Sequence, residues 1–230
     1  MGLGSGIRIW GSPAQGKLSG AIPPGLALIE SLLWEPHKGA YLKELHAERL
    51  ISSAEQLGFD FDREEILQKI ISIVDNIQAS RPQKLRIVMS QNGEINTETI
   101  DAQSTAPTVP VKLFLSNRPI PQAEWWLYFK TTHRPFYEHQ KRIQQKEHLL
   151  FYTKDGFVTE TDFANIIVEK EDGTLVSPPV ETGLLPGTMR QHLLETGIIR
   201  EEAIKLKELK GKRLFICNSV RKILPAELTV

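Results

Sequence analysis

The chain has 230 residues, with 28 basic and 28 acidic side chains and a single cysteine, Cys217. A net charge of zero argues against a general nucleic-acid binder or a protein that binds anionic membranes through bulk positive charge. One cysteine excludes an internal disulfide framework and a thiolate metal cluster, and the six scattered histidines lack metal-ligand spacing. Since no apolar run approaches the length of a membrane span, we expect a cytoplasmic protein with no nucleic-acid, membrane or metal partner.

The N-terminal segment, residues 1–24, is rich in glycine and serine, and we expect it to be flexible. No apolar stretch with a small-residue cleavage site follows its charges, so we expect no signal peptide. Residues 11–17 match the first seven positions of a phosphate-binding P-loop, but Leu18 stands where serine or threonine is needed. Pro23 and Pro24 also replace the helix that must follow such a loop. We therefore expect no P-loop.

Two helices are predicted next. Leucine and alanine recur at helical spacing over 42–57, and Gly58 stands where a C-terminal cap belongs. Asp62 and Glu65 form an acidic version of the capping box, followed by an apolar stripe to residue 77. These signals predict two consecutive helices.

A hairpin is predicted after the helices. Residues 84–90 and 94–100 change to a period of two, and Asn92-Gly93 between them is a strong turn signal. A strand is expected at 111–115, and the proline-containing stretch 116–121 is the best candidate for a linker. We therefore predict an N-terminal α/β domain over 1–115, an interdomain linker over 116–121 and a C-terminal domain over 122–230.

The pattern restarts beyond this linker with five large apolar residues that end at Lys130. A charged helix is expected at 134–148. Short strands are then expected at 149–153, 157–160, 165–169, 174–177 and 213–217, and helices at 188–195 and 201–209. The whole chain is predicted to be α+β.

Three positions suggest chemistry, although each also has an ordinary explanation. Lys130 could lie at the lip of a cleft, where desolvation would lower the pKa of its amine, or it could be a strand-end lysine that reaches water. Glu160 could belong to a site or be an edge-strand charge. Residues 187–190 open a helix whose first turn could bind an anion. Cys217 fits a small buried side chain better than a nucleophile.

The order of these motifs resembles the class IV aminotransferases, the fold type IV pyridoxal-phosphate enzymes. The resemblance covers roughly residues 25–225, and within the family it is strongest to the 4-amino-4-deoxychorismate lyases. It implies a smaller N-terminal α/β domain and a C-terminal domain with a mixed, barrel-like β core. The motifs are 45–50 (LHAERL), 130–134 (KTTHR), 160–166 (ETDFANI), 187–190 (GTMR) and 217–219 (CNS).

The resemblance also implies roles for individual residues. Lys130 matches the lysine that bonds covalently to pyridoxal 5'-phosphate, and Glu160 matches the carboxylate that pairs with its pyridine nitrogen. Arg49 matches the arginine that binds the cofactor phosphate. The remaining residues expected to bind the cofactor are Thr188 and Met189, through their backbone N–H groups, together with Asn218 and Ser219.

This sequence departs from the family pattern at two positions. Met189 stands where branched-chain members usually have threonine, which leans towards the lyases. Pro135 replaces a tyrosine that many transaminases carry five residues after the lysine, and the role of nearby Tyr137 stays open. His133 and Arg134 could bind an anionic substrate or could be exposed charges at a helix start.

These resemblances imply a lyase that converts 4-amino-4-deoxychorismate to 4-aminobenzoate and pyruvate in folate biosynthesis. One alternative is an aminotransferase acting on branched-chain or D-amino acids, and a remote one is a catalytically silent binding protein. The partners implied are a small anionic substrate, a second copy in a homodimer and a functional link to aminodeoxychorismate synthase.

Overall fold

A computed structural model describes residue 10, residues 22–122 and residues 124–229. The P-loop-like segment at 11–17 lies outside these residues, as does most of the segment 1–24 that we expected to be flexible. Within the described part of the chain, no helix is both long and apolar enough to cross a membrane.

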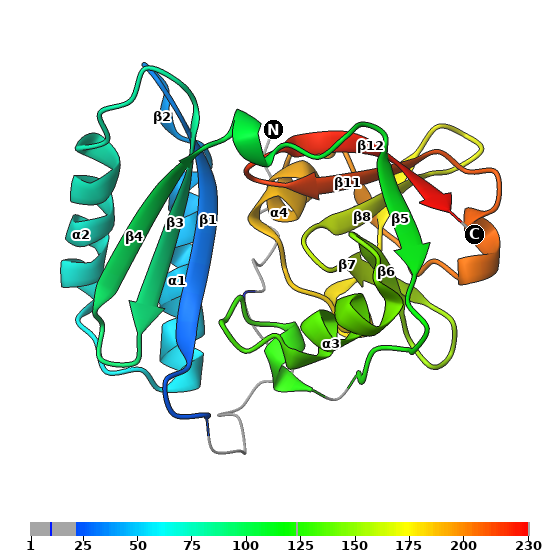
Figure 1. Ribbon diagram of the computed structural model, residues 1–230, viewed down its shortest axis with the longest axis horizontal. Helices are drawn as coiled ribbons and strands as arrows, with labels where there is room; N and C mark the ends of the chain where they lie inside the picture. Colours follow the sequence, from blue (N-terminus) through cyan, green and yellow to red (C-terminus); the bar gives the residue numbers. More distant parts are fainter. Residues whose placement is uncertain (1–9, 11–21, 123, 230) are drawn as a thin grey trace, which may run out of the picture.

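The first part of the chain forms a four-stranded antiparallel sheet in the order β2-β1-β3-β4, with two helices beside it (Figure 1). The elements are β1 (Ala27–Glu35), β2 (Gly39–Ala40), α1 (Lys43–Leu57), α2 (Arg63–Asp75), β3 (Gln83–Ser90) and β4 (Ile95–Asp101).

Local signals explain how these elements begin and end. Gly58 closes α1 in the left-handed conformation, at φ 68°. The side chain of Asp62 accepts a hydrogen bond of 2.8 Å from the backbone N–H of Glu65 and caps α2. Gly93, at φ 77°, lies in the turn between β3 and β4. Both predicted helices and the predicted hairpin are therefore confirmed.

The two faces of this sheet have different surroundings. Leu32 of β1 and Ile87 of β3 face the helices, where they lie near Leu50 of α1. Alternate residues along a strand point to opposite faces, so Ser31 and Arg86, paired across the two strands, face the other way. That second face looks towards the rest of the chain and lines the large cavity described below.

The second part of the chain forms a closed β-barrel. The ring is β8-β11-β12-β5-β6-β7, closed by pairing between β7 and β8, while β9 and β10 extend it beyond β8. The β5–β6 and β12–β5 pairs are parallel and the other pairs in the ring are antiparallel, so the barrel is mixed. The strands are β5 (Val111–Leu115), β6 (Leu149–Tyr152), β7 (Val158–Thr161), β8 (Asn165–Glu169), β9 (Leu175–Ser177), β10 (Arg200–Glu201), β11 (Leu214–Asn218) and β12 (Lys222–Thr229).

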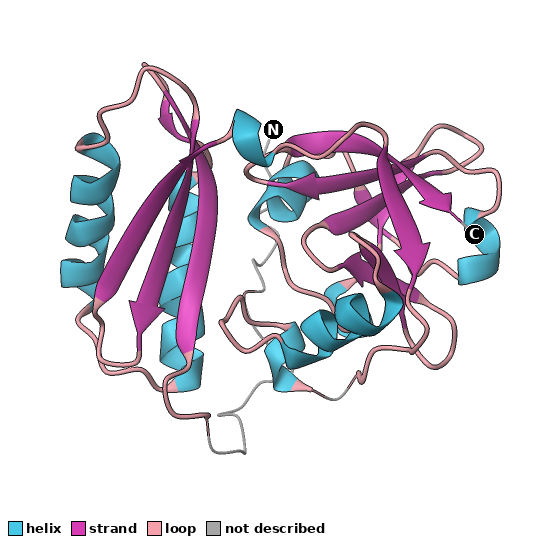
Figure 2. Cartoon of the chain, in the orientation of Figure 1, coloured by secondary structure: helices cyan, strands magenta, loops and turns pink. Residues whose placement is uncertain are grey.

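Helices surround this barrel (Figure 2), and the predicted α+β class with a mixed barrel is confirmed. The helix expected at 134–148 is shorter, and the one expected at 188–195 is found. The α-helices are α3 (Pro135–Gln144) and α4 (Thr188–Glu195), and the 3-10 helices are η1 (Gln103–Thr105), η2 (Trp125–Leu127), η3 (Val180–Thr182) and η4 (Leu206–Leu209).

The prediction of a helix at 201–209 is wrong. Arg200–Glu201 instead pair with β9 as the short strand β10, and the backbone N–H of Val158 donates to the carbonyl of Ile204 at 2.8 Å. Only the last four residues, η4, are helical. Backbone pairing with β9 and with β7 overrides the local helix propensity.

The chain crosses from the first sheet to the barrel earlier in the sequence than we expected. Strand β5 was expected in the N-terminal domain, but it pairs with β12 and β6 of the barrel. The chain therefore crosses from the first sheet to the second between Asp101 and Val111, before the stretch 116–121 that we expected to be the linker. The division into two domains itself stays a prediction.

Candidate active site

A cavity of about 440 Å³ lies between the first sheet and the barrel. Its walls come from β1 and β3 of the sheet, the segment before α3, strands β7 and β8, the start of α4 and the turn between β11 and β12. The volume is within the range of small-molecule and cofactor sites. Segments far apart in the sequence thus meet at one place.

Lys130 is fixed at this junction by its backbone. The N–H of Ile29 donates to the Lys130 carbonyl at 2.7 Å, and the N–H of Thr132 donates to the Ala27 carbonyl at 2.9 Å. The run of large apolar residues that precedes Lys130 begins with η2, and Trp126 packs in the core. The lysine side chain lines the cavity.

The surroundings of Lys130 favour its neutral form. Burial, with the positive charges of Arg134 and Arg49, lowers the pKa of Lys130 to about 7. No hydrogen bond joins its amine to any of the described residues. At neutral pH a large share of this amine is therefore unprotonated and able to act as a nucleophile. The cleft interpretation of Lys130 fits the structure better than an exposed strand end.

Glu160 lies on β7, with 6% of its surface exposed, and lines the same cavity. The Tyr137 hydroxyl donates to its Oε1 at 2.7 Å, and the backbone N–H of Leu185 donates to its Oε2 at 3.2 Å. The amide of Asn165 lies 3.5 Å from Oε2. Burial raises the pKa of Glu160 to about 7, although the Tyr137 hydrogen bond opposes that rise. Tyr137, whose role the sequence left open, thus orients this carboxylate.

The first turn of α4 forms one end of the cavity. Gly187 and Thr188 line it, and the leading N–H groups of a helix have no partner within the helix. A Cβ atom added to Gly187 would lie only 2.0 Å from Asn165 Oδ1, so the backbone approaches the barrel more closely here than another residue would allow. This end is suited to an anion.

Arg49 reaches the same end from α1. Its guanidinium makes two hydrogen bonds to the Glu30 carboxylate, at 2.6 and 2.9 Å, and a third to the carbonyl of Pro186 at 3.0 Å. His46 lies between Glu30, at 2.6 Å, and the Thr188 hydroxyl, at 3.1 Å. Burial alone would raise the pKa of Glu30, but Arg49 and His46 lower it to about 2.

We did not predict a role for Glu30, and His46 was noted only as part of a motif. A signal for Glu30 exists, because it is the one charge within the apolar stretch 26–34. A buried charge in a strand requires a partner. The spacing of His46 and Arg49, close to one helical turn, places both on the same face of α1.

Of the other residues predicted to bind the cofactor, some line the cavity and one does not. The Ser219 hydroxyl lines the cavity and donates to the Ser31 carbonyl at 3.0 Å. Asn218 also lines it and accepts hydrogen bonds from the two N–H groups that follow Ser219, so it shapes that turn. Met189 is not among the lining residues, and its side chain packs with Cys217 and apolar neighbours. The Met189 side chain is therefore part of the apolar packing and not of the cavity wall.

Four further basic side chains line the cavity, and of these only Arg134 was singled out from the sequence. Arg134 comes from the start of α3, and its guanidinium lies 4.5 Å from the Tyr137 ring. Lys84 and Arg86 come from β3, and Arg221 comes from the turn before β12. The signal for the β3 pair was their alternation with buried residues, which places them together on the opposite face.

Comparison with known proteins identifies the class. The sequence profile of the family described as amino-transferase class IV matches residues 27–228. The chain therefore belongs to the class IV aminotransferase family, and its mixed barrel is the architecture that the resemblance implied.

Some of the similar proteins are named as lyases and others as aminotransferases. A Schizosaccharomyces pombe protein, provisionally named as an aminodeoxychorismate lyase, is 26% identical over 213 residues, which cover 88% of this chain and 90% of that protein. The structure of a provisionally named amino-acid aminotransferase from Mesorhizobium loti has a TM-score of 0.78 at 28% identity, covering 89% of this chain and all of that one. A hypothetical aminotransferase from Mycobacterium tuberculosis, solved with PLP bound, has a TM-score of 0.71 at 19% identity and covers 88% of this chain and 80% of that one.

Proposed function

We propose that this protein is a pyridoxal-phosphate-dependent lyase that converts 4-amino-4-deoxychorismate to 4-aminobenzoate and pyruvate. The observation that carries the proposal is the placement of Lys130, with its lowered pKa, in one cavity with Glu160 and an anion-binding end. The lyase reaction, rather than transamination, is supported by the S. pombe relative, which is similar along most of its length.

The residues present fit the cofactor. Lys130 supplies an amine for the covalent bond to its aldehyde carbon, and Glu160 supplies a buried carboxylate for its ring nitrogen. Arg49, the Ser219 hydroxyl and the N–H groups of the α4 first turn would hold the phosphate. When bound, pyridoxal phosphate supplies an electron sink for the substrate carbon that loses its proton.

The protein's own residues would then carry the proton. The buried Lys130 amine would take the proton from the substrate ring as a general base. A pKa of about 7 suits both taking that proton and returning it to the departing enolpyruvate. Glu160, oriented by Tyr137 and Leu185, holds its carboxylate in a fixed position meanwhile.

A second candidate is an aminotransferase for branched-chain or D-amino acids, which would use the same lysine and carboxylate. It is supported by the similarity to the M. loti structure, at 28% identity over the whole of that chain. A catalytically silent binding protein is a remote third candidate.

The test is a pair of assays on purified, cofactor-loaded protein. Incubation with 4-amino-4-deoxychorismate should release 4-aminobenzoate and pyruvate in equal amounts, whereas transfer from branched-chain or D-amino acids to 2-oxoglutarate should be much slower. Lys130→Ala should abolish release, and Lys69→Ala, on the exposed side of α2, should not. Full lyase activity in Lys130→Ala would contradict the proposal, and amino transfer without lyase activity would favour the second candidate.

We also propose that the protein works as a homodimer functionally linked to aminodeoxychorismate synthase, as the family resemblance implies. Sedimentation of the purified protein tests the dimer. A coupled assay, in which the synthase produces the substrate, tests the link.

A further inference from the structure

A buried carboxylate lies behind the anion-binding end of the cavity. Glu30 is 2% exposed, and it faces the helices because its neighbours Ile29 and Ser31 line the cavity on the other face of β1. A buried charge of this kind is unfavourable unless its partners compensate for it. Neither Glu30 nor His46 is among the residues that line the cavity. Both can therefore act on a ligand there only through other residues.

Glu30 fixes one edge of the Arg49 guanidinium. Its carboxylate accepts hydrogen bonds from Nε at 2.9 Å and from Nη2 at 2.6 Å, and the Pro186 carbonyl accepts one from Nη1 at 3.0 Å. A guanidinium has five N–H groups. No hydrogen bond joins the other two, one on each terminal nitrogen, to any of the described residues. Because Arg49 lines the cavity, these two N–H groups can donate to an anion.

His46 links the same carboxylate to the first turn of α4. Glu30 is ionised, since its pKa is lowered to about 2, and a carboxylate can only accept hydrogen bonds. Nδ1 of His46, 2.6 Å away, must therefore carry a proton. Burial lowers the pKa of His46 against the pull of Glu30, so at neutral pH its Nε2 accepts from the Thr188 hydroxyl at 3.1 Å. The hydroxyl proton is thus directed at His46, and the backbone N–H groups of the turn are left for an anion.

These contacts join the first sheet to the barrel. Arg49 and His46 come from α1, whereas Pro186 precedes α4 and Thr188 begins it. The two contacts connect residues 137 and 142 positions apart in the sequence. One carboxylate, that of Glu30, therefore holds both parts of the anion-binding end, which are the guanidinium and the helix N-terminus.

Other charges lie near Glu30 without taking the place of these partners. Lys43 lies beside Glu30 and His46, but its side chain is 45% exposed. Lys130 interacts with Glu30 through its charge. Among the described residues, the hydrogen bonds to this carboxylate come from Arg49 and His46.

We infer that Glu30 and His46 are positioning residues for the cofactor phosphate. Glu30 fixes the guanidinium of Arg49, and His46 holds the first turn of α4 beside it. This inference rests on the proposed function, because it takes the bound anion to be the phosphate of pyridoxal phosphate. By charge alone a carboxylate would weaken phosphate binding. Its benefit is orientation, because a guanidinium with two bonds to a carboxylate has a fixed plane.

The test compares pyridoxal phosphate with pyridoxal, which has the same aldehyde and ring but no phosphate. Absorbance titration of the full-length protein follows the covalent bond of either ligand to Lys130. The variants are His46→Asn, whose amide can replace Nδ1 but does not reach Thr188, and Glu30→Gln, which removes the charge beside Arg49. Each should weaken binding of pyridoxal phosphate at least about tenfold, and that of pyridoxal less than about twofold, because the lost hydrogen bonds serve the phosphate.

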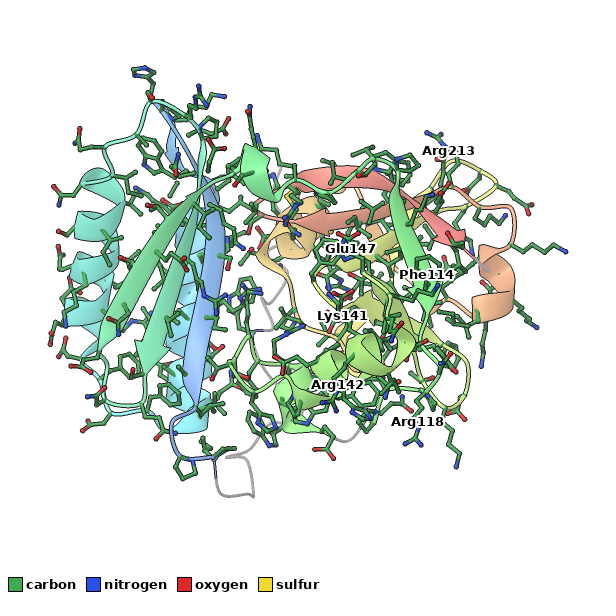
Figure 3. The ribbon with its side chains drawn as sticks, in the orientation of Figure 1. Phe114, Arg118, Lys141, Arg142, Glu147 and Arg213 are labelled. Carbon is green, nitrogen blue, oxygen red and sulfur yellow. The ribbon has the colours of Figure 1, made fainter. Side chains whose placement is uncertain are left out.

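Two exposed residues provide matched controls, Glu147→Gln and His139→Asn. Glu147 lies between α3 and β6 with 82% of its side chain exposed (Figure 3), and His139 is exposed on α3. Both control proteins should bind both ligands as wild type does. Equal weakening of the two ligands by His46→Asn, unchanged binding in that variant, or no preference of wild type for the phosphorylated ligand would overturn the inference.

A further variant keeps the test decisive if Glu30→Gln does not fold. Thr188→Val removes the hydroxyl and keeps the backbone N–H. It should weaken pyridoxal phosphate as much as His46→Asn does, and the double variant should bind it no more weakly than either single variant, because both break one contact. Additive losses would show that the contact has no such role.

The lyase assay on the same proteins separates this inference from the proposed reaction. If the variants lose affinity for the phosphorylated ligand alone but wild type shows no lyase activity, the proposed reaction fails and the positioning roles stand. If wild type is an active lyase and the variants keep their affinity, the reaction stands and the positioning roles fail.

Discussion

Glu160 should make the cofactor-free protein less stable as pH rises. Its carboxyl group is buried, and burial raises its pKa from 4.5 to about 7. Between these pH values the folded protein keeps a proton that the unfolded chain has lost. The stability provided by the protonated carboxyl is therefore complete below about pH 4.5 and is lost as pH rises through 7. A shift of this size corresponds to about 3 kcal/mol.

The variant Glu160→Gln tests this reasoning because an amide resembles the protonated carboxyl and does not titrate. Its free energy of unfolding, minus that of wild type, should be about 3 kcal/mol larger at pH 8 than at pH 4.5. Any constant cost of the amide cancels in this comparison. Urea unfolding at several pH values supplies the measurement, and Glu44→Gln, whose side chain is 72% exposed, is the control. A difference that does not change with pH would refute the account of Glu160.

Three other changes probe the same cavity. Tyr137→Phe removes the 2.7 Å hydrogen bond to Glu160, so the pKa of that carboxyl should rise further. The pH range over which stability is lost in the unfolding experiment should then move upwards. An unchanged range would show that Tyr137 does not lower the pKa of Glu160. Gly187→Ala places a Cβ atom 2.0 Å from Asn165 Oδ1 and should weaken cofactor affinity about tenfold or more, measured by absorbance titration, with partial recovery in the double variant that adds Asn165→Ala. Burial raises the pKa of Cys217 to about 12, so iodoacetamide at pH 8 should alkylate the unfolded chain but not the native one, and rapid native alkylation would contradict that burial.

The sequence predicts an element well where the local signal and the tertiary structure agree. Asp62 caps α2 and Gly58 ends α1 through contacts within a few residues, and both are visible as sequence patterns. β1 was missed for the opposite reason. Residues on both of its faces are buried, Leu32 against the helices and Ile29 against the cavity, so the alternation typical of a strand is absent.

β12 was missed because its stability comes from distant partners. Ala226 is the one buried residue of the strand, which also contains Pro225, so neither an alternation of buried residues nor propensity indicates it. Its partners are β11 and the parallel strand β5, which lies more than a hundred residues earlier in the chain. The same kind of long-range pairing turned the expected helix at 201–209 into an extended segment.

The candidate site divides in a similar way. The order of motifs singled out Lys130, Glu160 and Arg49, and the structure places all three around one cavity. Their roles stay predictions. The partners that tune them could not be predicted, because their contacts join distant residues. Thr188 meets His46 across 142 positions, and this distance is closed only by docking the barrel against the first sheet.

The most direct test of the central claim is the site of cofactor attachment. Purified protein incubated with pyridoxal 5'-phosphate is reduced with borohydride, digested and examined by mass spectrometry. We expect a pyridoxyl group on the peptide that contains Lys130, formed more readily as pH rises through about 7, and none in Lys130→Ala. Stoichiometric labelling of another lysine, or no labelling of Lys130 in protein with lyase activity, would contradict the account.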